Sequence, residues 1–130
     1  MTKLILLTHD ELEIIIRVIA VPLGAFGLSE LIQRTQLSEE ECRRISDFIG
    51  SHRSEDEVIE ISIDENDIIL MSKIFDISAE IVDPQEMHTM TGYTWDEART
   101  VSKKLHALAK SNYPNQIQVG QELKVPDTVE

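Results

Sequence analysis

The stretch that decides the fold is THDELEIIIRVIAV, which runs from Thr8 to Val21. Projected on a helix at about 100° per residue, its apolar side chains cover well over half of the circumference. Asp10, Glu13 and Arg17 leave only a narrow polar strip. A helix this apolar is buried on most sides, so we expect the rest of the chain to pack around it. The apolar positions are Leu12, Ile14, Ile15, Ile16, Val18, Ile19 and Val21.

Both ends of this helix carry sequence signals. Thr8 and Glu11 have the spacing of a capping box, in which each side chain bonds the other residue's backbone amide. Pro22 and Gly24 are residue types that end helices. We therefore predict a helix over residues 9–21 and a turn after it.

Two further helices are predicted in the next part of the chain. A short apolar stripe favours a helix over residues 28–36. A second capping box, at Ser38 and Glu41, opens a helix over residues 38–50 that Gly50 ends. The apolar face of that helix holds Cys42, Ile45, Phe48 and Ile49.

Residues 57–63, EVIEISI, alternate between apolar and polar side chains, which predicts a half-buried strand. The acidic segment DEND at 64–67 fits either a hairpin loop before a second strand or the cap of a helix. An apolar stripe at helical spacing favours a helix over residues 68–82, which Pro84 closes. That stripe consists of Leu70, Ile74, Ile77 and Ile81.

Residues 83–93 are predicted to form a loop. A third capping box, at Thr94 and Glu97, opens a helix over residues 95–111. The buried stripe of this helix is predicted to be Trp95, Ala98, Val101, Leu105 and Leu108, and its opposite face holds Arg99, Lys103 and Lys110.

The remaining extended segments are short. Residues 3–7 fit either an edge strand or a hydrophobic lead-in to the first helix, and residues 117–119 and 123–125 suggest a small hairpin. Together with the strand at 57–63 these segments predict a helix-rich α+β fold with a small antiparallel sheet. A chain of 130 residues can bury one core of useful size, so we expect residues 1–130 to form a single domain.

The charge of the chain is strongly acidic and unevenly spread. The formal net charge is −12, and residues 35–67 alone hold eleven acidic and three basic residues, a net charge of −8. Such a surface repels phosphate backbones and anionic membranes and attracts basic proteins. The middle of the chain is therefore predicted to form an acidic face.

Sequence features also indicate a compartment. Cys42 is the only cysteine, so no internal disulfide can form, which suits a reducing cytoplasm. The apolar run at 3–7 is interrupted too soon for a signal peptide, and no apolar stretch approaches the roughly 20 residues of a membrane span. We expect a cytoplasmic protein with no membrane partner.

The segment 28–49, LSELIQRTQLSEEECRRISDFI, resembles the helix-turn-helix unit of winged-helix DNA-binding domains. Its apolar positions occupy the places where that family packs two helices about a short turn. The resemblance implies an apolar helix before the unit, a role for residues 8–21. It also implies a strand-loop-strand wing after the unit, a role for residues 57–70, so the first half of the chain is expected to be winged-helix-like.

The chain departs from that family at two places. Gln36 stands at the turn position that is often glycine in the family. Glu39, Glu40 and Glu41 occupy the first turn of the helix that would approach DNA, where carboxylates meet phosphates unfavourably. The resemblance implies DNA binding, and these carboxylates make nucleic acid a disfavoured partner.

No sequence pattern assigns a reaction. The four histidines lack metal-ligand spacing and have no cysteine pair nearby, and there is no nucleophile elbow, Gly-rich phosphate loop or HExxH motif. Cys42 lies on an apolar helix face, where a buried and inert thiol is expected. We expect no metal and no cofactor.

The sequence favours a non-catalytic protein-binding or regulatory protein of the inhibitor, immunity or adaptor type. Its acidic face would bind a basic surface of another protein. The alternatives are a winged-helix transcriptional regulator and a small enzyme, and apolar surface left over by the predicted elements favours a homodimer. The candidate partner-binding residues are Glu39, Glu40, Arg43, Arg44, Asp47, Glu55 and Asp56.

Overall fold

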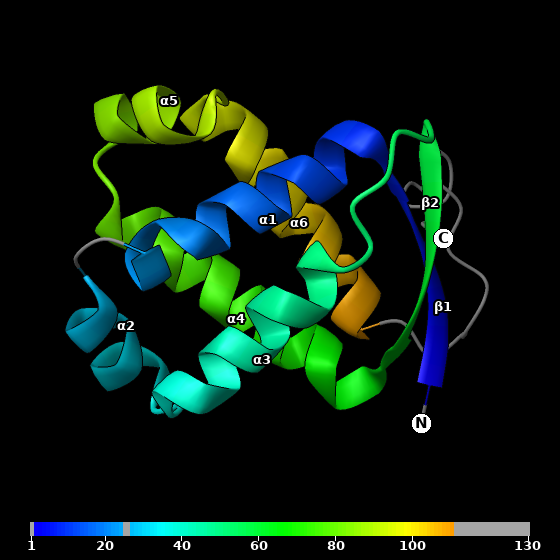
Figure 1. Ribbon diagram of the computed structural model, residues 1–130, viewed down its shortest axis with the longest axis horizontal. Coiled ribbons are helices and arrows are strands. Elements are labelled where there is room, and N and C mark those ends of the chain that lie inside the picture. Colours follow the sequence, from blue (N-terminus) through cyan, green and yellow to red (C-terminus); the bar gives the residue numbers. More distant parts are fainter. Residues whose placement is uncertain (1, 25–26, 111–130) are drawn as a thin grey trace.

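The first helix lies at the centre of the molecule. The computed structural model describes residues 2–24 and 27–110. Within them α1 (His9–Gly24) contacts both strands and each of the other helices, and Figure 1 shows it crossing the middle of the fold. The predicted central helix is therefore confirmed. The other elements are β1 (Thr2–Thr8), α2 (Leu28–Thr35), α3 (Glu39–Gly50), β2 (Val58–Asp64), α4 (Glu65–Ile81), α5 (Pro84–Thr91) and α6 (Trp95–Lys110).

The amino-terminal signals of α1 are confirmed, and the predicted end is not. The Glu11 amide donates to Thr8 Oγ1 over 3.1 Å, and the Thr8 amide donates to Glu11 Oε1 over 2.8 Å, so both halves of the capping box form. The helix continues through Pro22 to Gly24 because proline has a helical φ and removes only one hydrogen bond near the helix end. Ile15 and Ile19 are fully buried, and Ile16 keeps 9% of its exposure.

The two strands pair antiparallel at one end of the helices (Figure 1). Ile5 faces Ile61 across the sheet, and alternate residues of both strands are buried against the helices. Residues 3–7, which fitted a strand or a lead-in, thus belong to a strand. Lys3 is also on the inner face, where its Nζ donates to the Leu108 carbonyl oxygen over 3.2 Å.

The segment 57–70 does not form a strand-loop-strand wing. It contains β2 and then the first turns of α4, and β2 pairs with β1 from before the first helix. Asp64 decides between the two alternatives, because its side chain accepts from the Asn66 amide and caps a helix at Glu65. The helix therefore begins three residues before the predicted start at residue 68.

Residues 83–93, predicted as a loop, contain the helix α5. Asp83 accepts a hydrogen bond from the Gln85 amide, and Pro84 occupies the first helical position. Gly92 ends the helix at φ 85°, and its amide donates to the His88 carbonyl oxygen. The segment therefore carries a complete set of helix start and stop residues.

The other helices follow the predicted pattern. The helices predicted over residues 28–36 and 38–50 are α2 and α3, which each differ from the prediction by one residue at one end, and Ser38 caps α3 by accepting from the Glu41 amide over 3.1 Å. The turn between them places Gln36 at φ 66°, in the left-handed region. The described residues thus form a helix-rich α+β fold with a small antiparallel sheet, 72% helical. The predicted hairpin at residues 117–125 lies outside the described residues.

No single helix among the described residues is long and apolar enough to cross a membrane, and only α1 and α2 taken together, as a bent pair, reach that length and hydropathy.

Candidate protein-binding face

All seven candidate partner-binding residues are exposed. Five of them lie on the outer face of α3, whose inner face buries Cys42, Ile45 and Ile49 in the core. The other two lie on the connection from α3 to β2. Helix α3 has 12 residues and is therefore roughly 18 Å long, so the face is extended and not a single cluster. The α3 residues are Glu39, Glu40, Arg43, Arg44 and Asp47, and the connection holds Glu55 and Asp56.

The two arginines of this face are held by carboxylates of the same chain. Arg43 Nε donates to Glu39 Oε2 over 2.8 Å, as their spacing of one helical turn favours. Arg44 does not pair with Glu40 as its spacing suggests. It donates to both carboxylate oxygens of Asp67 on α4, over 3.2 and 3.0 Å, because a bidentate contact between helices holds a planar guanidinium better than a single bond along one helix.

Several carboxylates of the face have no such partner. The side chains of Glu40, Asp47, Glu55 and Asp56 make no hydrogen bond or ion pair with any residue that the structure describes. Their charges are uncompensated, whereas both arginines beside them are neutralised. The face therefore presents negative charge to solvent along its whole length.

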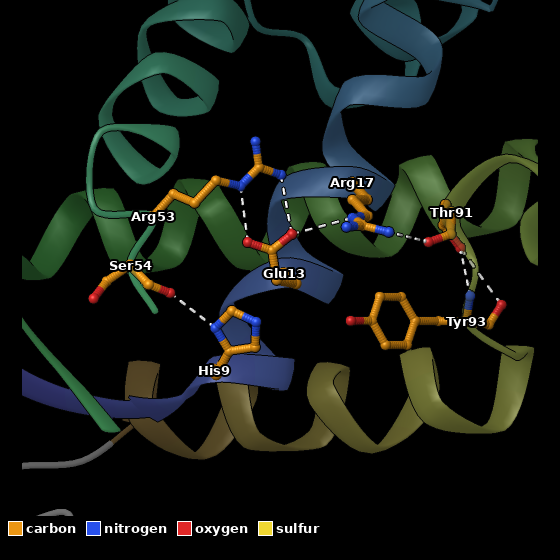
Figure 2. Close-up of polar contacts among 7 residues, drawn as sticks. All are labelled: His9, Glu13, Arg17, Arg53, Ser54, Thr91 and Tyr93. Carbon is orange, nitrogen blue, oxygen red and sulfur yellow. Dashed lines mark hydrogen bonds and ion pairs between the residues drawn. The ribbon is translucent and has the colours of Figure 1, made fainter. Parts of the chain in front are cut away.

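The connection that carries Glu55 and Asp56 is fixed to the first turns of α1. Arg53 donates to both oxygens of Glu13, over 2.8 Å from Nε and 3.1 Å from Nη2 (Figure 2). His9 contacts the connection through its side chain and its backbone. Its ring Nδ1 lies 2.8 Å from the Ser54 carbonyl oxygen, and its amide donates to the Glu57 carbonyl oxygen over 2.9 Å. Three residues of the connection are thus anchored around the two exposed carboxylates.

Glu13 is the centre of this anchor. Its side chain is 6% exposed, while Arg53 and Arg17 keep 52% and 46%. The hydrogen bonds from Arg53 hold the pKa of the Glu13 carboxyl below its ordinary value of 4.5, against the opposing effect of burial. The carboxylate is therefore ionised at neutral pH, and it holds the connection as a charged acceptor.

Arg17, in the middle of α1, extends the same network to the end of α5. Its Nε donates to Glu13 Oε1 over 3.1 Å, and its Nη1 donates to the Thr91 carbonyl oxygen over 3.1 Å (Figure 2). Its guanidinium carbon lies 5.7 Å from the centre of the Tyr93 ring, within the range of a cation-π contact. Glu13 thus links α1 directly to Arg53, after α3, and through Arg17 to the end of α5.

A shallow depression of about 360 Å³ lies beside the anchored connection. Its lining includes three acidic residues, Asp10, Glu55 and Glu57, with Thr8 and His9 at the end of β1 and the start of α1. Negative charge therefore surrounds a hollow large enough for the end of a basic side chain.

The described residues offer no arrangement typical of a catalytic nucleophile. Ser102 Oγ donates to Asp76 Oδ1 over 2.6 Å, and His106 Nε2 lies 2.6 Å from Asp76 Oδ2. The carboxylate stands between hydroxyl and imidazole, whereas a nucleophile needs the imidazole as its direct neighbour. The Cys42 thiol is buried, and burial raises its pKa. In ranges 2–24 and 27–110 no three His, Cys, Asp or Glu residues are grouped to hold a metal ion.

Sequence reasoning placed Glu13 on a narrow polar strip and missed its role. The available signal was a glutamate within an otherwise apolar helix, with Arg17 one turn later. Its main partner, Arg53, is 40 residues away in the chain, so no local pattern indicates the contact. Lys104 was missed in the same way: it is buried on α6, and its Nζ donates to Glu11 Oε1 over 2.6 Å.

Comparison of the chain with protein-family models, with curated proteins and with solved structures gives no match.

Proposed function

We propose that this chain is a non-catalytic protein that binds a basic surface of another protein through the outer face of α3 and the connection from α3 to β2. One observation carries the proposal. Four exposed carboxylates along this face have no partner among the described residues, whereas the arginines beside them are neutralised by other carboxylates. A basic partner would supply the missing counter-charges.

The anchoring of the connection supports the same proposal. Charged groups that steer association work best when their positions are fixed before the encounter, because ordering flexible segments opposes binding. Arg53 and Ser54 hold the connection to α1 on one side of Glu55, and Glu57 holds it on the other. The depression beside Glu55 would accept a lysine or arginine side chain of the partner.

The test compares two full-length variants with the same change in net charge. In the face variant, four uncompensated carboxylates become amides: Glu40→Gln, Asp47→Asn, Glu55→Gln and Asp56→Asn. In the control variant, four exposed carboxylates elsewhere become amides: Glu60→Gln, Glu80→Gln, Asp96→Asn and Glu97→Gln. Each protein is immobilised, exposed to extract of the native cell at low salt and eluted with a salt gradient.

We expect wild type and the control variant to retain the same basic protein and the face variant to lose it. For the purified pair, the face variant should associate about tenfold more slowly at low salt, with a flatter dependence on ionic strength and a smaller change in dissociation. Folding should be nearly unchanged, because the four carboxylates are exposed and repel one another. Equal loss of capture in both variants would show that net charge, and not this face, selects the partner, and full capture by both would show that neither does.

A second candidate function is binding of DNA. It is favoured by the order of α2, a short connection and α3, which is that of a helix-turn-helix unit. Its test is a titration of generic duplex DNA at several salt concentrations, since DNA binders show steeply salt-dependent affinity. In that case Glu39→Gln and Glu40→Gln would strengthen binding, whereas under the first proposal they would weaken binding of the protein partner.

A further inference from the structure

Helix α5 presents most of its side chains to solvent. Only Met87 and Thr91 of its eight residues are buried. Met90 is 47% exposed, and it is one of three large apolar side chains among the described residues that are exposed to this degree. The other two, Val58 and Ile69, are on β2 and α4.

Two hollows lie against α5, and Met90 lines both of them. The smaller has a volume of about 310 Å³, and its apolar wall is formed by Val21, Ile81 and Val82. The larger is an open depression of about 870 Å³ that ends at Trp95 in the first turn of α6. Methionine and tryptophan are enriched at interfaces, since methionine adapts its shape and tryptophan supplies a large contact area.

The charge around both hollows has one sign. Glu86 lines both, Glu30 lines the smaller, and no lysine or arginine among the described residues lines either. Glu86 makes no ion pair with any residue of the described ranges, whereas Glu30 is paired with Arg34. An occupant that fills these hollows therefore meets apolar walls with negative charge beside them.

We propose that α5 and the two hollows beside it form a second docking surface, which binds a segment of a partner protein that places large apolar side chains between basic ones. The apolar side chains enter the hollows at Met90, and the basic side chains lie against Glu86. This surface is separate from the face of α3, and the proposal does not depend on that face.

The test uses Trp95, which is the only tryptophan of the chain and lines the larger hollow. The full-length protein is titrated with a synthetic peptide rich in leucine and lysine that forms an amphipathic helix. A first control peptide has glutamine in place of every leucine, and a second has glutamate in place of every lysine. We expect a shift of Trp95 emission with the peptide that holds both leucine and lysine, and no shift with either control peptide.

Substitutions of two apolar side chains with equal exposure, Met90 and Ile69, test where the peptide binds. Met90→Gln should weaken binding of the peptide about tenfold, as truncation of a central interface residue does, and Glu86→Gln should weaken it about threefold at low salt. Ile69→Gln is the control, because Ile69 is also 47% exposed but lines neither hollow, and it should change affinity less than twofold. Glu40→Gln with Asp47→Asn should leave the Trp95 response unchanged.

Three results would overturn the proposal. Equal effects of Met90→Gln and Ile69→Gln would show nonspecific adhesion of the peptide. Binding of the glutamine-substituted peptide with a similar affinity would show that charge alone is recognised. A shift of Trp95 emission with protein concentration, in the absence of peptide, would assign the hollows to a second copy of this chain.

Discussion

Replacement of Glu13 by glutamine would test whether one buried carboxylate fixes the acidic connection. The substitution keeps the size of the side chain and removes its charge. Three guanidinium hydrogen bonds, of 2.8, 3.1 and 3.1 Å, then meet an amide whose single oxygen replaces only one of the two carboxylate oxygens and whose NH2 group is turned toward at least one guanidinium N–H. At neutral pH the change should therefore destabilise the fold.

The size of the loss can be bounded from exposure. Breaking a fully buried ion pair costs about 3–5 kcal/mol, and an exposed pair contributes about 0–1 kcal/mol. Glu13 is buried but both arginines are about half exposed, so water can replace part of the interaction, and we expect a loss of about 2 kcal/mol. Glu39→Gln is the matched control, since Glu39 also pairs with an arginine four residues later but is 50% exposed; it should cost less than about 0.5 kcal/mol.

The assay is chemical denaturation at several pH values, with hydrogen exchange as a local probe. Because the pKa of folded Glu13 is lowered, its stabilisation is fully present above the ordinary value of 4.5 and is lost as the pH falls through the lowered value. The difference in the free energy of unfolding between wild type and Glu13→Gln should therefore become smaller below about pH 4.5. Amides of residues 51–57 should exchange faster in the variant, while those of the sheet should not.

Equal losses for Glu13→Gln and Glu39→Gln would refute this reasoning, as would a difference from wild type that stays constant down to the acid transition. Either result would mean that the connection is held by its other contacts, chiefly those of His9 to Ser54 and Glu57.

Three further outcomes follow from single positions. Gln36→Gly should raise the free energy of unfolding by about 0.5 kcal/mol, because glycine relieves the left-handed φ of 66° at a small entropic cost, and thermal unfolding would show the change; a less stable variant would contradict it. Ser78→Ala should stabilise by up to about 1 kcal/mol in denaturant titrations, since its buried Oγ has no hydrogen-bond partner among the described residues, whereas a clear loss would reveal a missed partner. Cys42 should react slowly with a thiol reagent at pH 8 and fast only in denaturant, because burial raises its pKa, so rapid labelling of the native protein would show that α3 opens.

The elements that sequence reasoning found are those with a periodic apolar face. Helix α1 and strand β2 were placed within a few residues, because burial of Ile15 or Ile61 leaves a repeating mark along the chain. Helix α5 was missed because, apart from Pro84, its only apolar side chains are Met87 and Met90, which leave almost no periodicity. Its signals were Asp83, Pro84 and Gly92, and Pro84 was interpreted as the end of the preceding helix alone.

The candidate site was predicted in part for a related reason. Exposed charge can be counted in a sequence, and every residue named for the acidic face is exposed. Partners that meet only in three dimensions cannot be counted in this way. Arg44 pairs with Asp67 and not with Glu40, and Glu13 pairs with Arg53. Both pairs depend on how the helices and connections pack.

The pairing of β1 with β2 also constrains how the chain can fold. Thr8 pairs with Val58 at one end of the sheet and Thr2 with Asp64 at the other, so the ladder encloses α1, α2 and α3. Ribosomes deliver the first strand well before the second, and its apolar residues, Ile5 and Leu7, have no strand to pair with during that interval. The closing of so long a loop carries an entropic cost that local helix formation does not. Helices α1 to α3 can thus form early during synthesis, whereas the sheet is completed only when residues 58–64 leave the exit tunnel. Until then the unpaired first strand is exposed to aggregation or to capture by a chaperone.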